Sequence, residues 1–131
     1  MRELNRKTLW WSFAWGLLAF VFIASLIPMP PPLTHLPQGF DKYEHIAAYG
    51  SLSFYFGQLI SRFKLHLRYA LALFCIGALL EILQGLTGYR SPDWYDLAAN
   101  SIGVLLGLLL CLTPLKSGVA MLDALLAPAN K

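Results

Sequence analysis

Residues 67–87 read LRYALALFCIGALLEILQGLT and give the clearest indication of the fold. Their length matches the roughly 17–25 apolar residues that cross a bilayer as a helix. Further apolar segments lie at about 9–27, 45–60 and 97–113. The composition agrees, because 57% of the residues are hydrophobic and only 13% are charged. The sequence therefore predicts an all-α membrane protein with four transmembrane helices in a single domain, 1–131.

The basic residues predict the orientation of these helices, because cytoplasmic flanks of membrane helices carry an excess of Lys and Arg. Eight basic residues lie before the first segment, between the second and third, or after the fourth: Arg2, Arg6, Lys7, Arg62, Lys64, Arg68, Lys116 and Lys131. Both termini are therefore expected in the cytoplasm, and a short helix over 118–127 is expected to lie on the inner surface or to fray. No basic helix with interleaved aromatic residues indicates nucleic acid as a partner.

Glu81 is the least expected residue of the third segment. A charge at the centre of a membrane helix costs roughly 2.5–3.5 kcal/mol on insertion scales, so such a group usually has a partner or a function. Gln84 shares its helical face. A rise of about 1.5 Å per residue puts Glu81 on the order of 9 Å below the outer end of the helix. We expect Glu81 to point into the bundle, either as a functional group or as a packing group bonded to a neighbouring helix.

Polar residues also open the second segment. Asp41 and His45 are four residues apart and can meet across one helical turn, with Tyr49 continuing the same line inward. A nearby carboxylate would fix the tautomer of His45, which can act as an acid, a base or a nucleophile near neutral pH. Asp41 taken alone also fits a helix cap. Lys42 stands between them and offers a positive charge for an anionic group.

The fourth segment carries Asp96, Asn100, Gly103 and Gly107 at helical spacing. These residues predict a helix face that is polar at its outer end and made of small side chains further in. Small residues four apart let another helix backbone approach closely, which would bring Asn100 towards the polar residues of the third segment. The alternative use of the two glycines is a homodimer seam.

Arg90 lies in the short connection before the fourth segment. Its planar guanidinium matches a carboxylate or a phosphate, although arginine at this depth also contacts lipid headgroups. The carboxylates and the histidine include atom types that metals prefer. There is no paired-histidine motif, however, and Lys42 and Arg90 would repel a cation. We therefore expect no metal and no other cofactor.

Together these motifs resemble the VanZ-like family of small bacterial membrane proteins. The resemblance is carried by Asp41-Lys42-x-x-His45-x-x-x-Tyr49, by Glu81-x-x-Gln84, and by Arg90 followed by Asp96-x-x-x-Asn100-x-x-Gly103-x-x-x-Gly107, and it covers roughly Phe40 to Leu110. The name-giving member of that family is associated with resistance to the glycopeptide antibiotic teicoplanin. The resemblance implies a multi-pass protein of the bacterial cytoplasmic (inner) membrane, in the cell envelope, with its functional face outward.

The residues leave more than one function open. An acid/base site would handle an anionic lipid-linked or cell-wall (peptidoglycan-precursor) substrate. Its catalytic groups would be Asp41, His45, Glu81 and Asp96, and its binding groups Lys42, Tyr49, Gln84, Arg90 and Asn100. A non-catalytic module that binds or shields a lipid headgroup or a glycopeptide needs the same polar residues. A third interpretation makes them a buried network that locks the helices together.

Overall fold

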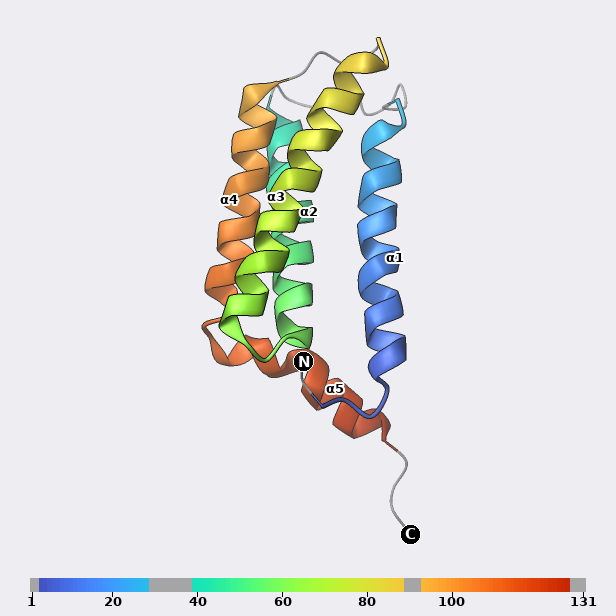
Figure 1. Ribbon diagram of the computed structural model, residues 1–131, viewed down its shortest axis with the longest axis vertical. Helices are drawn as coiled ribbons and strands as arrows, with labels where there is room; N and C mark the ends of the chain where they lie inside the picture. The colour runs from blue at the N-terminus through green and yellow to red at the C-terminus, as the bar shows by residue number, and fades with distance from the viewer. Residues whose placement is uncertain (1–2, 29–38, 89–92, 128–131) are drawn as a thin grey trace.

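The structure is a computed structural model that describes residues 3–28, 39–88 and 93–127. Its elements are α1 (Lys7–Leu26), α2 (Phe40–Leu59), α3 (Phe63–Leu86), α4 (Trp94–Leu110), the 3-10 helix η2 (Pro114–Ser117) and α5 (Gly118–Leu126). Figure 1 shows α2, α3 and α4 side by side, α1 along one side of them, and α5 across one end of the bundle. We call this the α5 end, and the opposite end the loop end. The predicted all-helical fold is confirmed.

The number of membrane spans is only partly supported. By length and composition, α1 and α3 can each cross a membrane. A third span is obtained only if α4 and the segment Pro114–Leu126 count as one, although the chain bends by 80° between them. The helix α2 is 20 residues long, but it begins at Phe40 rather than near residue 45 and so includes the polar residues before that point. Two or three spans are therefore supported, and a fourth through α2 belongs to our proposal below.

Two glycines let α4 lie directly against α2. A Cβ atom on Gly103 would be 2.6 Å from the carbonyl oxygen of Ile46, and one on Gly107 would be 2.6 Å from the carbonyl oxygen of Gly50. Both glycines are buried within this one chain. The homodimer seam through Gly103 and Gly107 is therefore not supported, because α2 already fills the space along this strip.

Replacing either glycine by alanine should separate the two helices. We expect Gly103→Ala and Gly107→Ala each to lower the free energy of unfolding, since overpacking a tight contact costs about 1–3 kcal/mol. Gly16→Ala is the matched control, because nothing lies within 4 Å of a Cβ atom there. The measurement is the thermal midpoint of the detergent-solubilised protein. Equal midpoints for all three variants would show that the close contact between α2 and α4 does not limit thermal stability.

The helix α1 is held near the α5 end by aromatic packing. The ring of Trp11 lies 6.0 Å from that of Phe56 and 5.9 Å from that of Tyr69, measured between centroids. Phe56 and Tyr69 are themselves stacked at 5.5 Å. Offset and tilted ring pairs at such distances stabilise beyond their buried area. This cluster joins α1 to both α2 and α3.

Asp123 fastens α5 to the start of α1. Its carboxylate is 2% exposed and accepts hydrogen bonds from Trp10 Nε1 at 2.8 Å, from the backbone N–H of Arg6 at 3.0 Å, and from the backbone N–H of Asn5. The first N–H groups of a helix lack partners inside it, and a negative charge there complements the helix dipole. Burial alone would raise the pKa of Asp123, but these hydrogen bonds hold it below its ordinary value. No sequence pattern predicts this contact.

We expect Asp123→Asn to loosen this end of the molecule, because the amide keeps the shape but loses the charge that the N–H groups bind. Hydrogen exchange at residues 5–10 should become faster by on the order of tenfold, because local opening becomes easier. In the wild-type protein the lowered pKa means that this stabilisation is complete above about pH 4 and is lost only as the pH falls further. Leu125→Ala, at an 80% exposed position of α5, is the control. Unchanged protection in Asp123→Asn would contradict the assignment.

Candidate functional site

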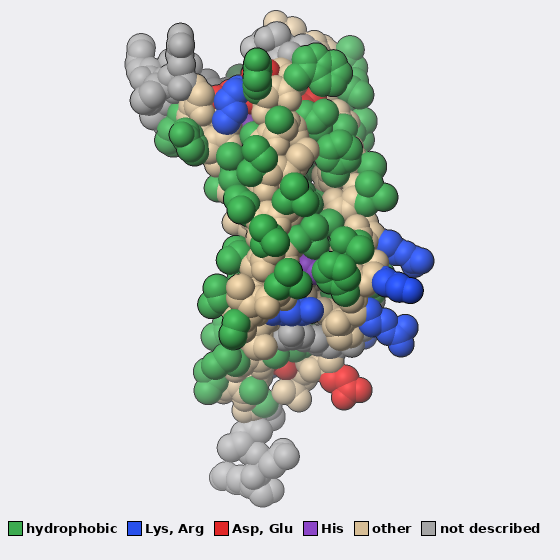
Figure 2. Space-filling view, turned by 90° about the vertical axis from the view of Figure 1, so that its left-hand side faces the viewer, with side chains coloured by type: hydrophobic (Ala, Val, Ile, Leu, Met, Phe, Trp, Pro, Cys, Tyr) green, Lys and Arg blue, Asp and Glu red, His purple; other side chains and the backbone are tan. Residues whose placement is uncertain are grey.

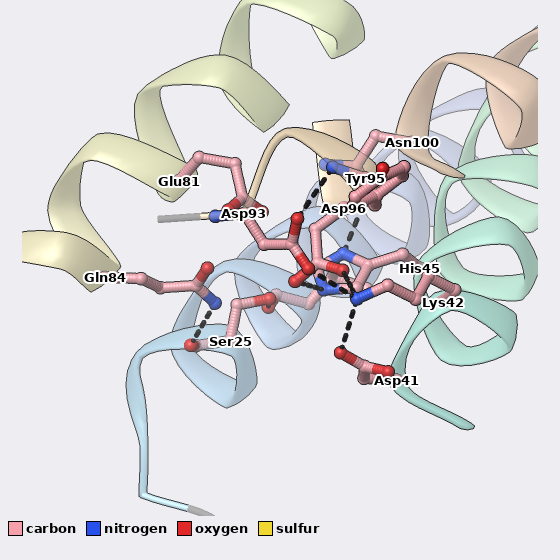
Figure 3. A network of polar contacts seen from close by, with 11 residues as sticks. Ser25, Asp41, Lys42, His45, Glu81, Gln84, Asp93, Tyr95, Asp96 and Asn100 are labelled. Carbon is pink, nitrogen blue, oxygen red and sulfur yellow. Dashed lines mark hydrogen bonds and ion pairs between the residues drawn. The ribbon is translucent and has the colours of Figure 1, made fainter. Parts of the chain in front are cut away.

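Polar side chains from three helices meet at the loop end. We call them the polar cluster, and its members are Asp41, Lys42, His45 and Tyr49 of α2, Glu81 of α3, and Asp93, Asp96 and Asn100 at the start of α4. Figure 3 shows most of these side chains directed toward one another, with Gln84 at the margin. Of the residues proposed from the sequence, the structure thus brings together Asp41, Lys42, His45, Tyr49, Glu81, Asp96 and Asn100, and Gln84 lies at the margin. Residues 89–92, Arg90 included, lie outside the described residues.

Local helix starts place the acidic residues. Gly39 has a φ of 86° and begins α2, which puts Asp41 in the first turn. Asp93 caps α4, since its Oδ1 accepts a hydrogen bond from the backbone N–H of Tyr95 at 2.8 Å, and Asp96 follows in the first turn. Carboxylates at helix N-termini are favoured by unpaired N–H groups and by the helix dipole. Two helix starts at one end of the bundle therefore gather several negative charges.

Lys42 joins the carboxylates of both helices. Its Nζ lies 2.9 Å from Asp41 Oδ2, 2.7 Å from Asp93 Oδ2 and 2.7 Å from Asp96 Oδ1. An ammonium group has three donors, so these contacts use its full capacity. In the structure Lys42 neutralises carboxylates of the protein and ties α2 to α4. A contact between Lys42 and an anionic substrate group stays a prediction.

His45 lies between an amide and a carboxylate. Its Nδ1 is 2.9 Å from Asn100 Oδ1, and its Nε2 is 3.6 Å from Asp96 Oδ2. An amide oxygen only accepts, so with this amide orientation Nδ1 carries the proton and Nε2 faces Asp96. We had expected Asp41 to orient His45. Asp41 binds Lys42 instead, and Asp96 supplies the carboxylate for His45.

Glu81 and Gln84 both point into the bundle, as expected. Glu81 is 7% exposed, and its Oε2 accepts a hydrogen bond from the backbone N–H of Asp93 at 3.4 Å. Gln84 is 2% exposed and donates from Nε2 to the carbonyl oxygen of Ser25 at 2.7 Å. That carbonyl belongs to the last turn of α1, where helix carbonyls lack internal partners. Gln84 therefore connects α3 to α1, while Glu81 belongs to the polar cluster.

Tyr49 lies one helical turn after His45 on α2, on the side of the polar cluster that faces the α5 end. Its side chain is 1% exposed, and its Cε1 and Cζ atoms lie 3.3 Å from the position of a Cβ on Gly77. The Nδ2 of Asn100 lies 3.0 Å from the same position, so the absence of a side chain at Gly77 lets both groups reach α3. The hydroxyl of Tyr49 interacts electrostatically with Glu81, and within the described part of the chain it has no hydrogen-bond partner.

Sequence reasoning missed the roles of two residues at this end. Asp93 both caps α4 and binds Lys42. The sequence contains an indication of the capping role, because an aspartate after a proline and just before an apolar helical run is typical of an N-cap. Ser25 contributes only its backbone carbonyl oxygen. Every residue type carries this group, so the sequence could not indicate the contact.

Two groups of side chains have the spacing of metal ligands. One is formed by Asp41, Asp93 and Asp96, and the other by His45, Glu81 and Asp96; in each, one ligand atom per residue lies within 4.8 Å of the others. The ammonium of Lys42 binds all three carboxylates of the first group. In the second group the ammonium binds only Asp96, through its Oδ1 atom.

The helices and the polar cluster define an all-helical membrane protein with a charged site at one end of its bundle. A family model described as VanZ/LLP1 matches residues 5–116. Since this match covers most of the chain, the protein belongs to the VanZ/LLP1 family, and the resemblance seen in its motifs is confirmed. No curated protein and no solved structure matches the chain.

Removing the ammonium of Lys42 should make the stability of the protein depend on pH in a new way. Lys42 holds the pKa of Asp93 below its ordinary value through a direct hydrogen bond. In Lys42→Met the carboxylates repel one another, so their pKa values rise and deprotonation destabilises the fold. The loss of thermal stability relative to wild type should therefore grow as the pH rises through about 4 to 7. Glu44→Gln, an exposed change on the same helix, is the control. A pH-independent difference would contradict this role of Lys42.

Proposed function

We propose that the polar cluster handles the anionic end of a lipid-linked or cell-wall substrate at the outer face of the cytoplasmic membrane. The observation that carries this proposal is the setting of His45. One ring nitrogen is bonded to Asn100 and the other faces the buried carboxylate of Asp96. A histidine held in one tautomer between such partners is suited to proton transfer.

The proposed topology has four spans, with α2 and α4 completing the set and both termini in the cytoplasm. Figure 2 shows Lys and Arg side chains gathered toward the α5 end of the face that it draws, with hydrophobic side chains covering much of the length above them. The positive-inside tendency then favours the α5 end as cytoplasmic and the loop end as external. The internal polar contacts of α2 support a span despite its polar first turns, because paired groups are tolerated inside a helix bundle.

In this proposal His45 accepts a proton from the substrate or from water, and Asp96 stabilises the resulting imidazolium. Glu81 is proposed as the acid, because its carboxyl group is 7% exposed and lies in the same polar cluster as His45. Asn100 fixes the orientation of the ring. Arg90 is proposed to hold the anionic group of the substrate, a role for which its planar guanidinium is suited.

A non-catalytic binding or shielding function is the second candidate. It is favoured by the contacts of Lys42, which already satisfy three carboxylates within the protein. A network that is satisfied internally keeps its shape without any reaction and can present a fixed polar surface. The ligand would be a lipid headgroup or a glycopeptide.

Conservative variants separate these two functions. If the site is catalytic, His45→Gln and Glu81→Gln should each reduce turnover by roughly 100-fold or more, the range of general acid/base catalysis. If it only binds, Glu81→Gln should retain much of the effect, because an amide can replace a carboxylate in hydrogen bonding.

The measurement compares the lipid-linked cell-wall precursors of cells that express each variant at equal membrane levels, by mass spectrometry, together with their susceptibility to teicoplanin. Glu44→Gln serves as the control, being exposed and on the same helix. A precursor profile and a susceptibility that are identical in wild type, His45→Gln and an empty-vector strain would exclude the proposed function.

A further inference from the structure

We infer that His45, Glu81 and Asp96 form a binding site for a divalent metal ion of the zinc or manganese type. Their three ligand atoms lie within 4.8 Å of one another at the centre of the polar cluster. One imidazole and two carboxylates are a donor set that such ions accept. The inference concerns the same side chains as the proposed function but goes beyond it, because metal binding does not require that any substrate be turned over.

The geometry of His45 and Asp96 fits a shared ion. Bonds of about 2.1 Å at a tetrahedral angle separate two ligand atoms by about 3.4 Å. Nε2 of His45 and Oδ2 of Asp96 are 3.6 Å apart, longer than a hydrogen bond and close to that separation.

The surroundings of these ligands also match a metal site. Metal-binding histidines almost always donate their other N–H to an oxygen of the protein, which fixes the ring and leaves the lone pair for the ion. Asn100 Oδ1 is placed to accept from Nδ1 of His45 at 2.9 Å. The second oxygen of Asp96 accepts from Lys42 at 2.7 Å. Hydrogen bonds thus hold Nδ1 of His45 and Oδ1 of Asp96, while Nε2 of His45 and Oδ2 of Asp96 face each other.

The charge of the site calls for a cation. The carboxylates of the polar cluster belong to Asp41, Glu81, Asp93 and Asp96. With all four carboxyl groups ionised and His45 neutral, four negative charges against the one positive charge of Lys42 leave a formal charge of −3 on the described members of the cluster. Buried charges must be compensated, and one divalent ion would neutralise most of this excess.

The sequence argued against a metal because Lys42 would neutralise the carboxylates and repel a cation. The structure removes part of that objection. Lys42 binds the Oδ1 atom of Asp96, while the Oδ2 atom faces His45. Its ammonium therefore binds all three carboxylates of the first group but only one oxygen atom of the second. The side chains of Lys42, Asp41 and Asp93 are 29%, 30% and 35% exposed, so ions can approach from this edge.

Tyr49 provides an independent observation. Its hydroxyl is buried next to Glu81 and has no hydrogen-bond partner within residues 3–28, 39–88 and 93–127. A buried hydroxyl without a partner is costly, and it usually marks a missing water or ion. A water molecule bound to the ion beside Glu81 would accept or donate the hydrogen bond that this hydroxyl lacks.

A bound ion also reconciles the site with an anionic substrate. A phosphate or carboxylate would be repelled by the excess negative charge of the polar cluster, but it can occupy an open position on the metal. While the ion is bound, His45 serves as a ligand and does not transfer protons.

The test measures metal binding by the purified full-length protein in detergent after chelator treatment. We expect one Zn²⁺ or Mn²⁺ per chain by calorimetry and elemental analysis, and visible absorption bands of a four- or five-coordinate ion with Co²⁺ as a probe. Binding should weaken as the pH falls from about 7.5 to 5.5, because protons compete for the imidazole. His45→Gln and Glu81→Gln should abolish it, and Asn100→Ala should weaken it by about 10–100-fold through loss of ring orientation.

Glu44→Gln is the matched control and should bind as wild type does. Circular dichroism and gel filtration select the variants that remain folded. The loss of the wild-type Co²⁺ bands as the pH falls from about 7.5 to 5.5 tests the imidazole ligand even if a variant fails to fold. The inference is overturned if the wild-type protein binds no ion in the micromolar range, or if folded His45→Gln binds as well as the control.

The same experiment separates this inference from the proposed function. Metal binding without any effect on cell-wall precursors would contradict the proposed function and support the metal site. A precursor effect in cells, together with no ion bound by the purified wild-type protein, would keep the acid/base proposal and overturn the metal site.

Discussion

The contact between α2 and α4 is the constraint on which the rest of the structure depends. Polar groups inside a largely apolar bundle are stable only when they meet partners at short distance. Gly103 and Gly107 allow the two backbones to approach until a Cβ atom would no longer fit. This approach sets Lys42 against Asp96 and His45 against Asn100 near the ends of the helices. The polar cluster is thus a consequence of small residues deeper in the same interface.

The helix α1 is attached differently, at its two ends and through one aromatic cluster. At the loop end Gln84 binds a carbonyl oxygen of its last turn, and at the α5 end Asp123 binds the N–H groups of Asn5 and Arg6, just before its first turn. Both contacts satisfy backbone groups that a helix cannot satisfy internally. They leave the outward face of α1 apolar, with Phe20 and Ile23 more than half exposed, as a lipid-facing helix requires.

Membership of the VanZ/LLP1 family and the chemistry of the polar cluster answer different questions. The family match rests on the chain from residue 5 to 116 and establishes relationship. The chemical proposals rest on His45, whose two ring nitrogens face an amide and a carboxylate. Proton transfer and metal binding compete for the same nitrogen atom, because each uses the lone pair of Nε2.

Apolar length and residue type alone determined the helical fold, the inward position of Glu81, and most members of the site, because hydrophobic periodicity and the cost of intramembrane charge are local properties. The sequence did not determine which groups pair. Lys42 binds Asp96 and Asp93, more than 50 residues away, and Asp96 rather than Asp41 faces His45. The glycine strip packs against α2 of its own chain, and Asp123 finds α1. Only the tertiary structure decided these pairings, because they depend on how close the helices lie and on how each is rotated about its axis.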